Sequence, residues 1–169
     1  MDTLWSPWRS KYIDTFKQED KKEKEECFLC EAMNSPDRDA ELLVITRREL
    51  CFAMLNKYPY NNGHMLISPY RHICDFNELT TDEMTAIMLL INDSIKVLNR
   101  CVKPHGFNVG ANLGRAAGAG VPGHLHFHIV PRWNGDTSFM PTLADVKIVS
   151  QALEDNQREL SLMFKEMFG

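Results

Sequence analysis

Half of the six histidines in this chain of 169 residues lie within five consecutive positions, at every second residue. The run, residues 123–130, reads Gly-His-Leu-His-Phe-His-Ile-Val, so that the histidines are His124, His126 and His128. On a β-strand, residues two apart share a face, which would set these imidazoles about 6.6 Å apart in one row. The apolar residues between them would point to the other face, as core. Because a row of imidazoles makes a poor hydrophobic surface, the pattern favours a functional site.

Two kinds of chemistry use such a row. Three imidazoles can hold one Zn²⁺ that activates water, or one imidazole can attack an electrophilic phosphorus while its neighbours orient it and neutralise charge. The preceding loop, residues 112–123, contains Arg115 and four glycines, among them Gly118 and Gly120. Backbone N–H groups of such a loop can approach a polyanion closely. The loop therefore favours phosphate chemistry over simple hydration.

Short apolar and alternating segments predict the strands that would position this row. Three of them, residues 42–46, 50–55 and 64–68, follow one another too closely for parallel crossovers, which indicates an antiparallel meander. Residues 107–112 and 124–130 alternate apolar with polar or small residues and predict two further strands. We therefore expect an antiparallel sheet of about five strands.

Two helices complete the predicted fold. Thr80 and Glu83 form a capping-box pattern at the start of a helix that reaches Val102. A second helix is predicted from Asp145 to Phe168. The predicted apolar stripe of the first helix, which would pack on one face of the sheet, consists of Met84, Ile87, Met88, Ile91, Ile95, Leu98 and Val102. Strands with one long helix among them indicate the α+β class.

Composition excludes several classes of function. The net charge of −4 and the pI of 5.9 give no basic footprint for nucleic acid or an anionic membrane. The longest apolar run, residues 86–91, is far shorter than the ~20 residues of a membrane-spanning helix. The N-terminal sequence has no apolar signal region, so we expect a soluble, cytoplasmic protein. Five cysteines in such a protein indicate reduced thiols or metal ligands.

The histidine run, followed by Pro131-Arg132, resembles the signature of the histidine triad (HIT) superfamily of nucleotide hydrolases and transferases. Residues 52–59 and 62–72 resemble the second conserved block of that family. The resemblance covers residues 27–141 and implies a HIT-like fold for them, with residues 142–169 as a C-terminal helix packed on that domain. Residues 1–26 are expected to form an aromatic arm and a charged connector within the same single domain. Residues 4–9 and 131–141 resemble a bacterial branch related to diadenosine tetraphosphate phosphorylases.

The resemblance implies roles for the three histidines. His126 would attack the α-phosphorus and carry the nucleotide. His128 would donate to phosphate oxygens and to the leaving group, and His124 would hold the geometry through a hydrogen bond or a metal. His64 matches a structural histidine.

The resemblance also implies a substrate site. Asn56 matches a position that contacts the ribose, and Asn112 one near the phosphates. Arg115, Gly118 and Gly120 belong to the loop expected at the phosphates. A loop glutamine of some relatives is replaced here by Gly120, which removes one contact to the leaving group.

Cys27 and Cys30 form a C-x₂-C pair that could supply two ligands of a tetrahedral zinc. The resemblance implies His72 and His124 as the other two, in a closed structural site; the alternative is a reduced pair of thiols without metal. Cys51, Cys74 and Cys101 are expected to be small core residues. No carboxylate pair demands Mg²⁺, although Mg²⁺ can assist by binding substrate phosphates.

The sequence thus predicts an enzyme that cleaves a phosphoanhydride of a dinucleoside polyphosphate, such as diadenosine tetraphosphate, through a nucleotidyl-histidine. Water or inorganic phosphate would complete the reaction. Three alternatives remain: a nucleoside phosphoramidate hydrolase, a nucleotide-binding module without turnover, and a zinc hydrolase that uses all three histidines. Cys27 and Cys30 count against the last, because they offer zinc a softer site. The partners expected are a nucleotide and a second copy of the chain in a homodimer.

Overall fold

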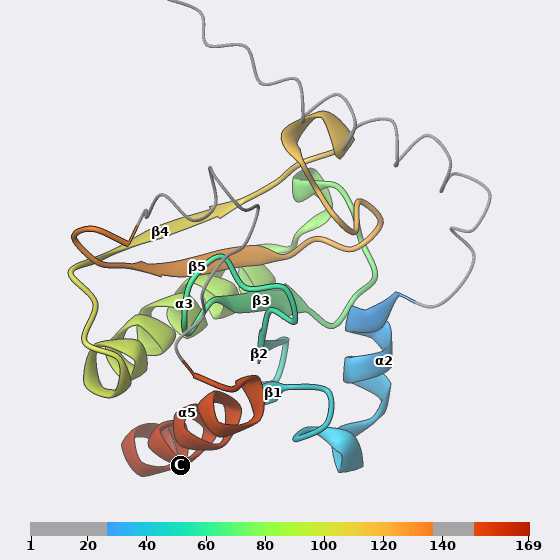
Figure 1. Cartoon of the computed structure of the whole chain (residues 1–169). Helices are drawn as coiled ribbons and strands as arrows, with labels where there is room; N and C mark the ends of the chain where they lie inside the picture. The colour runs from blue at the N-terminus through green and yellow to red at the C-terminus, as the bar shows by residue number, and fades with distance from the viewer. Residues whose placement is uncertain (1–26, 137–150) are drawn as a thin grey trace, which may run out of the picture.

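A five-stranded antiparallel sheet forms the centre of the computed structural model, which describes residues 27–136 and 151–169 (Figure 1). The strand order is β1-β2-β3-β5-β4. The strands are β1 (Val44–Arg47), β2 (Cys51–Leu55), β3 (Met65–Pro69), β4 (Gly106–Ala111) and β5 (Phe127–Arg132). The α+β class and the sheet of five strands are confirmed. The predictions for the N-terminal arm, its connector and residues 137–141 lie outside the described residues.

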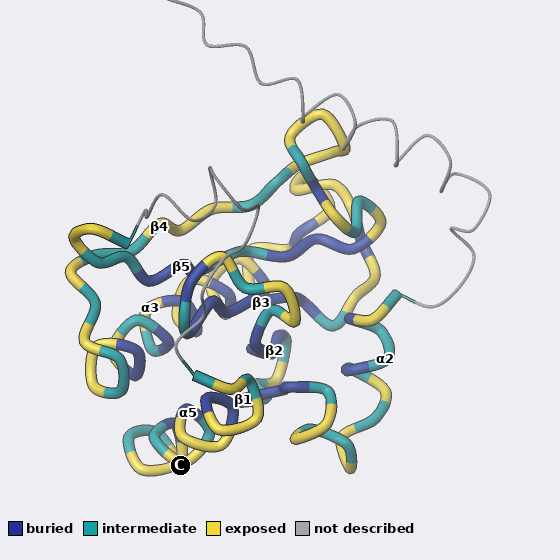
Figure 2. Tube along the Cα trace, viewed as in Figure 1, coloured by how far each residue is buried: buried dark blue, intermediate teal, exposed yellow. Residues whose placement is uncertain are grey.

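Two helices cover one face of the sheet. Helix α3 (Thr81–Cys101) packs on β2, β3 and β5, and helix α5 (Leu153–Phe168) packs on α3 and β1. The capping box is confirmed, because Thr80 Oγ1 accepts from the Glu83 backbone N–H and the Glu83 carboxylate accepts from the Thr80 N–H. The core between sheet and helices is the dark blue interior of Figure 2.

The buried face of α3 differs in part from the predicted stripe. Met84 and Met88 are 37% and 60% exposed, whereas Leu90 and Val97 are buried. The residues that face the sheet follow a heptad-like spacing centred on Ile87, Leu90/Ile91 and Val97/Leu98, so the two methionines lie on its flank.

Two predicted boundaries are wrong. Gln151 and Ala152 are not helical, so the last helix begins at Leu153 and not at Asp145. Strand β5 begins at Phe127 and not at His124. Leu125 donates its N–H to the Ile73 carbonyl (2.7 Å) and accepts from Ser68 Oγ (3.0 Å), so residues 124–126 bond to the loop after β3 and to a side chain before the ladder with β3 begins.

Helix α2 (Phe28–Asn34) covers part of the opposite face of the sheet, over β1 and β2. A second apolar cluster fills this contact and includes Leu29 and Ala32 of the helix and Phe52 and Met54 of β2. Strand β2 is therefore buried on both faces. The part of this face formed by β3, β5 and β4 carries His128, with His126 just before β5. Helix α2 and its N-cap bring Cys30 and Cys27 beside His124.

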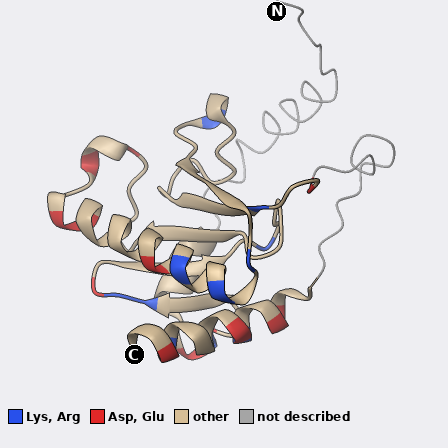
Figure 3. Cartoon of the chain, turned by 90° about the vertical axis from the view of Figure 1, so that its left-hand side faces the viewer, with Lys and Arg blue, Asp and Glu red and all other residues tan. Residues whose placement is uncertain are grey.

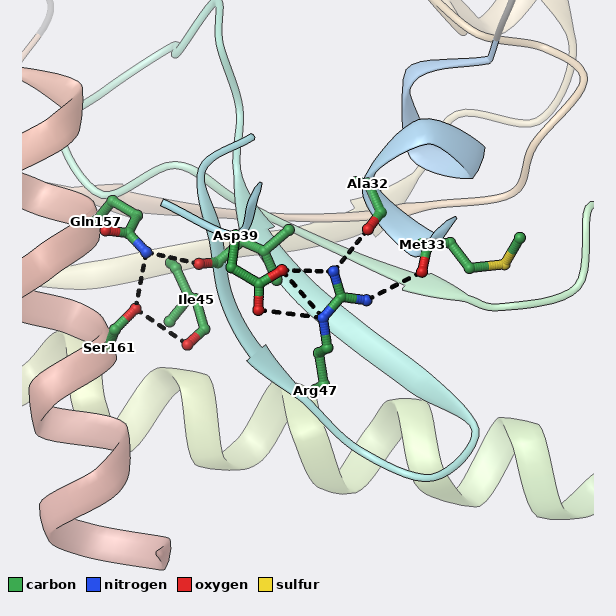
Figure 4. A network of polar contacts seen from close by, with 8 residues as sticks. Ala32, Met33, Asp39, Ile45, Arg47, Gln157 and Ser161 are labelled. Atoms are coloured by element: carbon green, nitrogen blue, oxygen red, sulfur yellow. Dashed lines mark hydrogen bonds and ion pairs between the residues drawn. The ribbon is translucent and has the colours of Figure 1, made fainter. Parts of the chain in front are cut away.

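A polar network ties α2 and α5 to the edge strand β1 (Figure 4). Arg47 pairs with Asp39 and donates to the carbonyls of Ala32 (2.6 Å) and Met33 (3.4 Å), at the C-terminal end of α2. On α5, Ser161 Oγ donates to the Ile45 carbonyl (3.0 Å) and Gln157 Nε2 to the Val44 carbonyl (2.7 Å). The free carbonyls of an edge strand are thus satisfied by helix side chains.

The acidic residues of α3 precede its basic residues, and α5 carries more acidic than basic residues (Figure 3). This distribution agrees with the absence of a basic footprint in the composition. No helix within residues 27–136 and 151–169 is long and apolar enough to cross a membrane.

Candidate active site

The hydrogen bond made by His126 fixes which of its ring nitrogens carries the proton. Nδ1–H donates to the His124 carbonyl (2.8 Å), because a carbonyl oxygen can only accept. In the neutral ring, Nε2 then keeps its lone pair. Burial lowers the pKa of His126, so the ring is neutral at pH 7. His126 therefore has the tautomer that a nitrogen nucleophile requires.

A chain of hydrogen bonds places the proton of His128 on Nε2, the nitrogen that carries the lone pair in His126. The Tyr60 backbone N–H donates to His64 Nδ1 (3.0 Å), so His64 Nε2 carries the proton and donates to His128 Nδ1 (2.9 Å). The neutral His128 ring must then carry its proton on Nε2. His64 is fully buried and hydrogen-bonded, as expected of the structural histidine that the resemblance implies.

His128 Nε2 is a buried donor with no hydrogen-bond partner among the described residues. Burial, and then the proximity of His126, lower the pKa of His128 to about 4. The ring centroids of His126 and His128 are 5.0 Å apart. A lone pair on one ring and an N–H on its neighbour are thus available together. A buried donor of this kind requires an explanation, and a ligand oxygen would supply one.

The third histidine of the run, His124, belongs to a different cluster. Its Nε2–H donates to the Pro69 carbonyl (3.0 Å), which leaves the lone pair on Nδ1. His124 Nδ1 lies 3.3 Å from Cys27 Sγ and 3.5 Å from Cys30 Sγ, and His72 Nδ1 lies 3.1 Å from Cys30 Sγ. All four ligand atoms lie within 4.8 Å of one another. The structure therefore assembles a Cys₂His₂ group that can hold a metal ion.

The dimensions of this group fit zinc. Bonds of about 2.3 Å to sulfur and 2.0–2.1 Å to nitrogen place tetrahedral S and N ligands roughly 3.6 Å apart, close to the separations above. The Pro69 carbonyl fixes the ring of His124, as partners of zinc-bound histidines do. Burial and the hydrogen bond to Cys27 raise the pKa of the Cys30 thiol to about 11 when no cation is bound.

The alternative of one zinc held by all three histidines of the run does not fit. His124 turns its lone pair toward the cysteines, and His126 Nδ1 is occupied by a backbone carbonyl. Among the described residues, the Cys₂His₂ group is the one set of His, Cys, Asp or Glu side chains whose ligand atoms lie close enough together to hold a metal ion. Of the other cysteines, Cys51 is buried in the core as expected, but Cys74 is exposed, because it lies in the loop after β3.

Beside His128 lies a trough of about 400 Å³ between β4, β5 and the loop before β3. The register of the two strands opposes Gly110 to His128 and Asn108 to Val130. Opposed residues of an antiparallel pair project to the same face, so this register carries polar side chains of β4 to the histidine face. His126 is not among the described residues that line the trough. The lining includes Tyr60, Asn108, Asn112, His128, Arg132 and Asp136.

The predicted substrate residues are brought together only in part. Asn112 lines the trough, and its Nδ2 donates to the Gly118 carbonyl (3.2 Å). Gly118 has φ +86°, a backbone conformation that favours glycine. Asn56 donates to His64 Nδ1 (3.4 Å), at the end of β2. Arg115 and Gly120 are exposed, and neither is among the described residues that line the trough.

Sequence reasoning gave no role to Tyr60, Asn61, Arg132 or Asp136. Arg132 donates through Nε and Nη2 to Asp136 (2.6 and 2.8 Å), and Asn61 Nδ2 donates to the same carboxylate (2.8 Å). These donors hold the pKa of Asp136 well below its usual range. The available signal was strand alternation: Arg132 lies four residues after His128, and therefore on the same face of β5.

This fold and this pair of clusters define a histidine triad protein. The family model described as "HIT domain" matches residues 37–135. The chain belongs to the HIT family.

Among curated relatives, the AP-4-A phosphorylase of Mycobacterium tuberculosis is 43% identical over 123 residues, which are 73% of this chain and 63% of that protein. The Bis(5'-nucleosyl)-tetraphosphatase [asymmetrical] of Schizosaccharomyces pombe is 30% identical over 121 residues, 72% of this chain and 63% of that protein. The chain thus spans less than two thirds of the length of either relative.

Solved structures agree with the family. A Zn-bound histidine triad family protein from Mycobacterium smegmatis superposes with a TM-score of 0.67 at 25% identity, over 83% of this chain and 94% of that one. A hypothetical histidine triad nucleotide-binding protein from Sulfolobus tokodaii gives a TM-score of 0.67 at 26% identity, over 83% and 93%.

Proposed function

We propose that this protein cleaves a phosphoanhydride bond of a dinucleoside polyphosphate such as diadenosine tetraphosphate. The observation that carries the proposal is the pairing of tautomers, a lone pair on His126 Nε2 next to a proton on His128 Nε2. The AP-4-A phosphorylase and the tetraphosphatase among the relatives support this substrate class.

In the proposed reaction, His126 Nε2 attacks the α-phosphorus. The N–P bond forms as the bond to the bridging oxygen breaks, and the electron pair leaves on the departing polyphosphate. Water or inorganic phosphate then attacks the nucleotidyl-histidine and restores the imidazole. His128 Nε2–H donates to the oxygens on which charge develops, and the loop of Asn112 and Gly118 encloses the phosphates.

The state of His128 favours a phosphoanhydride over a phosphoramidate. An amine must be protonated to leave, whereas a polyphosphate leaves as an anion that a hydrogen bond stabilises. With a pKa of about 4 in the ligand-free chain, His128 is a neutral hydrogen-bond donor at pH 7, which suits an anionic leaving group. This argument places nucleoside phosphoramidates second among the candidate substrates.

The Cys₂His₂ group would hold a structural zinc. A closed set of four protein ligands leaves no position for a reactive water, so zinc would fix α2 and the loop of His72 against the segment that carries His126. We also propose a homodimer. Strand β4 is an edge of the sheet whose outer side pairs with no other described strand, and Val109 on it is 45% exposed.

Incubation with diadenosine tetraphosphate, with and without inorganic phosphate, tests the function directly. Mass spectrometry would show ADP and ATP only when phosphate is present if the protein is a phosphorylase. AMP and ATP in water alone would identify a hydrolase. Binding without product in either tube would contradict the proposal and favour the binding module.

The route is tested separately by stereochemistry. Two in-line displacements at phosphorus give net retention, so a chiral α-phosphorothioate substrate should keep its configuration. Inversion would exclude the covalent route while leaving the substrate class intact.

A further inference from the structure

In the proposed reaction, His128 Nε2–H donates to the oxygens on which charge develops as the bond opposite His126 Nε2 breaks. The trough begins at His128, whose buried Nε2–H has no partner among the described residues, and is therefore open to the departing group. We infer that this trough binds the nucleoside of the departing nucleotide and that Tyr60 is its stacking platform. The inference rests on the proposed function and makes the second nucleoside a determinant of specificity.

The size of the trough supports a nucleoside and not a smaller leaving group. Ammonia or inorganic phosphate would fill only a small part of the roughly 400 Å³ that the trough offers. Pockets for ligands of drug or nucleotide size begin at about 300 Å³. A departing group that carries a base and a sugar matches this volume.

Tyr60 has the position and exposure of a stacking residue. Its ring lies 4.8 Å from the His64 ring and 6.2 Å from the His128 ring, with an angle of only 18° to the latter. The two histidines support the tyrosine from the protein side, yet Tyr60 is 52% exposed. An aromatic surface that is held rigidly and left half in solvent is suited to take the π-face of a base.

The far end of the trough is polar and rigid. Arg132 is held by both oxygens of Asp136, and its Nη1 donates to Asn108 Oδ1 (2.7 Å). Asn61 Nδ2 bonds both to Asp136 and to the Pro131 carbonyl (2.9 Å), which fixes the carboxylate. The trough therefore offers an aromatic surface beside His128 and a rigid polar end formed by Arg132, Asp136 and Asn108.

Two substrates that differ only in the second nucleoside test the inference. Diadenosine tetraphosphate and adenosine 5′-tetraphosphate share the adenosine and the four phosphates at which His126 would act. We expect the wild-type protein to have the higher kcat/KM for diadenosine tetraphosphate. Tyr60→Ala should lower the ratio of the two kcat/KM values by roughly 5- to 150-fold, the range measured for the loss of one stacked base. Tyr60→Phe should retain the ratio.

Tyr58→Ala is the matched control. Tyr58 lies two residues away, is 78% exposed and is not among the described residues of the trough, so its removal should leave the ratio unchanged. An equal fall for both substrates in Tyr60→Ala would overturn the inference, since Tyr60 would then act only through His64 and His128. Tyr58→Ala with the same effect as Tyr60→Ala would overturn it as well.

The two proposals fail in different ways. If the wild-type protein cleaves both tetraphosphates with equal kcat/KM, the trough does not bind the second nucleoside, while the proposed function stands. If the wild-type protein cleaves neither, the proposed function is wrong and the inference falls with it.

Discussion

Two clusters of histidines share one short segment of the chain, and they differ in where their ring nitrogens point. In the Cys₂His₂ cluster, His72 and His124 both turn Nδ1 toward the thiols, so that four ligand atoms converge. In the cluster of His64, His126 and His128, the first two rings donate through one nitrogen, whereas the N–H of His128 has no partner among the described residues. The first arrangement suits a cation; the second suits the transfer of a phosphoryl group.

The clusters meet at a single backbone atom. The His124 carbonyl accepts the proton of His126 Nδ1, while the His124 ring belongs to the metal group. The same residue therefore positions His126, the proposed nucleophile, through its main chain and supplies a proposed metal ligand through its side chain. Identical side chains acquire different chemistry here because the neighbouring carbonyls and peptide N–H groups differ.

Removal of His126 should distinguish the two clusters by the largest effect, a loss of turnover without a loss of zinc. We expect His126→Ala to lower kcat for diadenosine tetraphosphate by a thousandfold or more, ~4 kcal/mol, because the nucleophile is lost. The zinc content, measured by elemental analysis, should remain at the wild-type value. His105→Ala is the matched control, since His105 lies before β4, outside both clusters. A His126→Ala protein with near-normal turnover would remove His126 from the reaction.

Loss of a thiol should have the converse effect. Cys30→Ser should abolish stoichiometric zinc and, with free zinc at 100 to 1,000 times the wild-type Kd, remove about 2.7–4.1 kcal/mol from the free energy of unfolding. Turnover should fall by less than in His126→Ala, because His126 remains. Urea titration with and without a chelator measures the effect. Cys74→Ser is the control, since that cysteine is exposed and outside the group; equal chelator sensitivity in all three proteins would contradict the assignment of the site.

Much of this architecture was predictable from the sequence. The alternation of residues 124–130 placed Leu125 and Ile129 in the core and His126 and His128 on the other face, and the Thr80–Glu83 pattern marked the start of α3. These predictions succeeded because periodicity and capping are local properties. For the metal group, the C-x₂-C spacing indicated Cys27 and Cys30, whereas His72 and His124 came from the family resemblance, since no local pattern joins residues 27 and 124.

The remaining features depend on tertiary contacts. The tautomers of His64 and His126 follow from the Tyr60 N–H and the His124 carbonyl, whose directions no sequence pattern reports. The trough depends on the register of β4 against β5. The strand ladder begins late because Leu125 bonds to Ile73 in a distant loop. Long-range pairing, and not propensity, decided these three features.

Acid should lower the free energy of unfolding through His128. The pKa of His128 is about 4 in the folded chain and 6.5 when unfolded, so below pH 6.5 the unfolded state binds the proton and the folded state does not. The free energy of unfolding should therefore be unaffected by His128 above pH 6.5 and fall by up to ~3 kcal/mol by pH 4. Urea titrations of wild type and His128→Gln across this range isolate the effect, because loss of metal is common to both. Parallel pH profiles would contradict it.

The smallest expected effect concerns Arg47, which contacts neither cluster. Its guanidinium donates to the Ala32 and Met33 carbonyls at the end of α2, the helix that begins next to Cys27 and contains Cys30. Loss of these charge-assisted bonds costs ~1–2 kcal/mol, so Arg47→Gln should loosen α2 and weaken zinc binding roughly tenfold. The zinc-saturated variant should nevertheless turn over at the wild-type rate, since the hydrogen bonds of His126 and His128 are untouched. Competition with a chromogenic chelator measures the affinity. Slower turnover at saturating zinc would mean that α2 positions His126 directly, and that the two clusters are not separable.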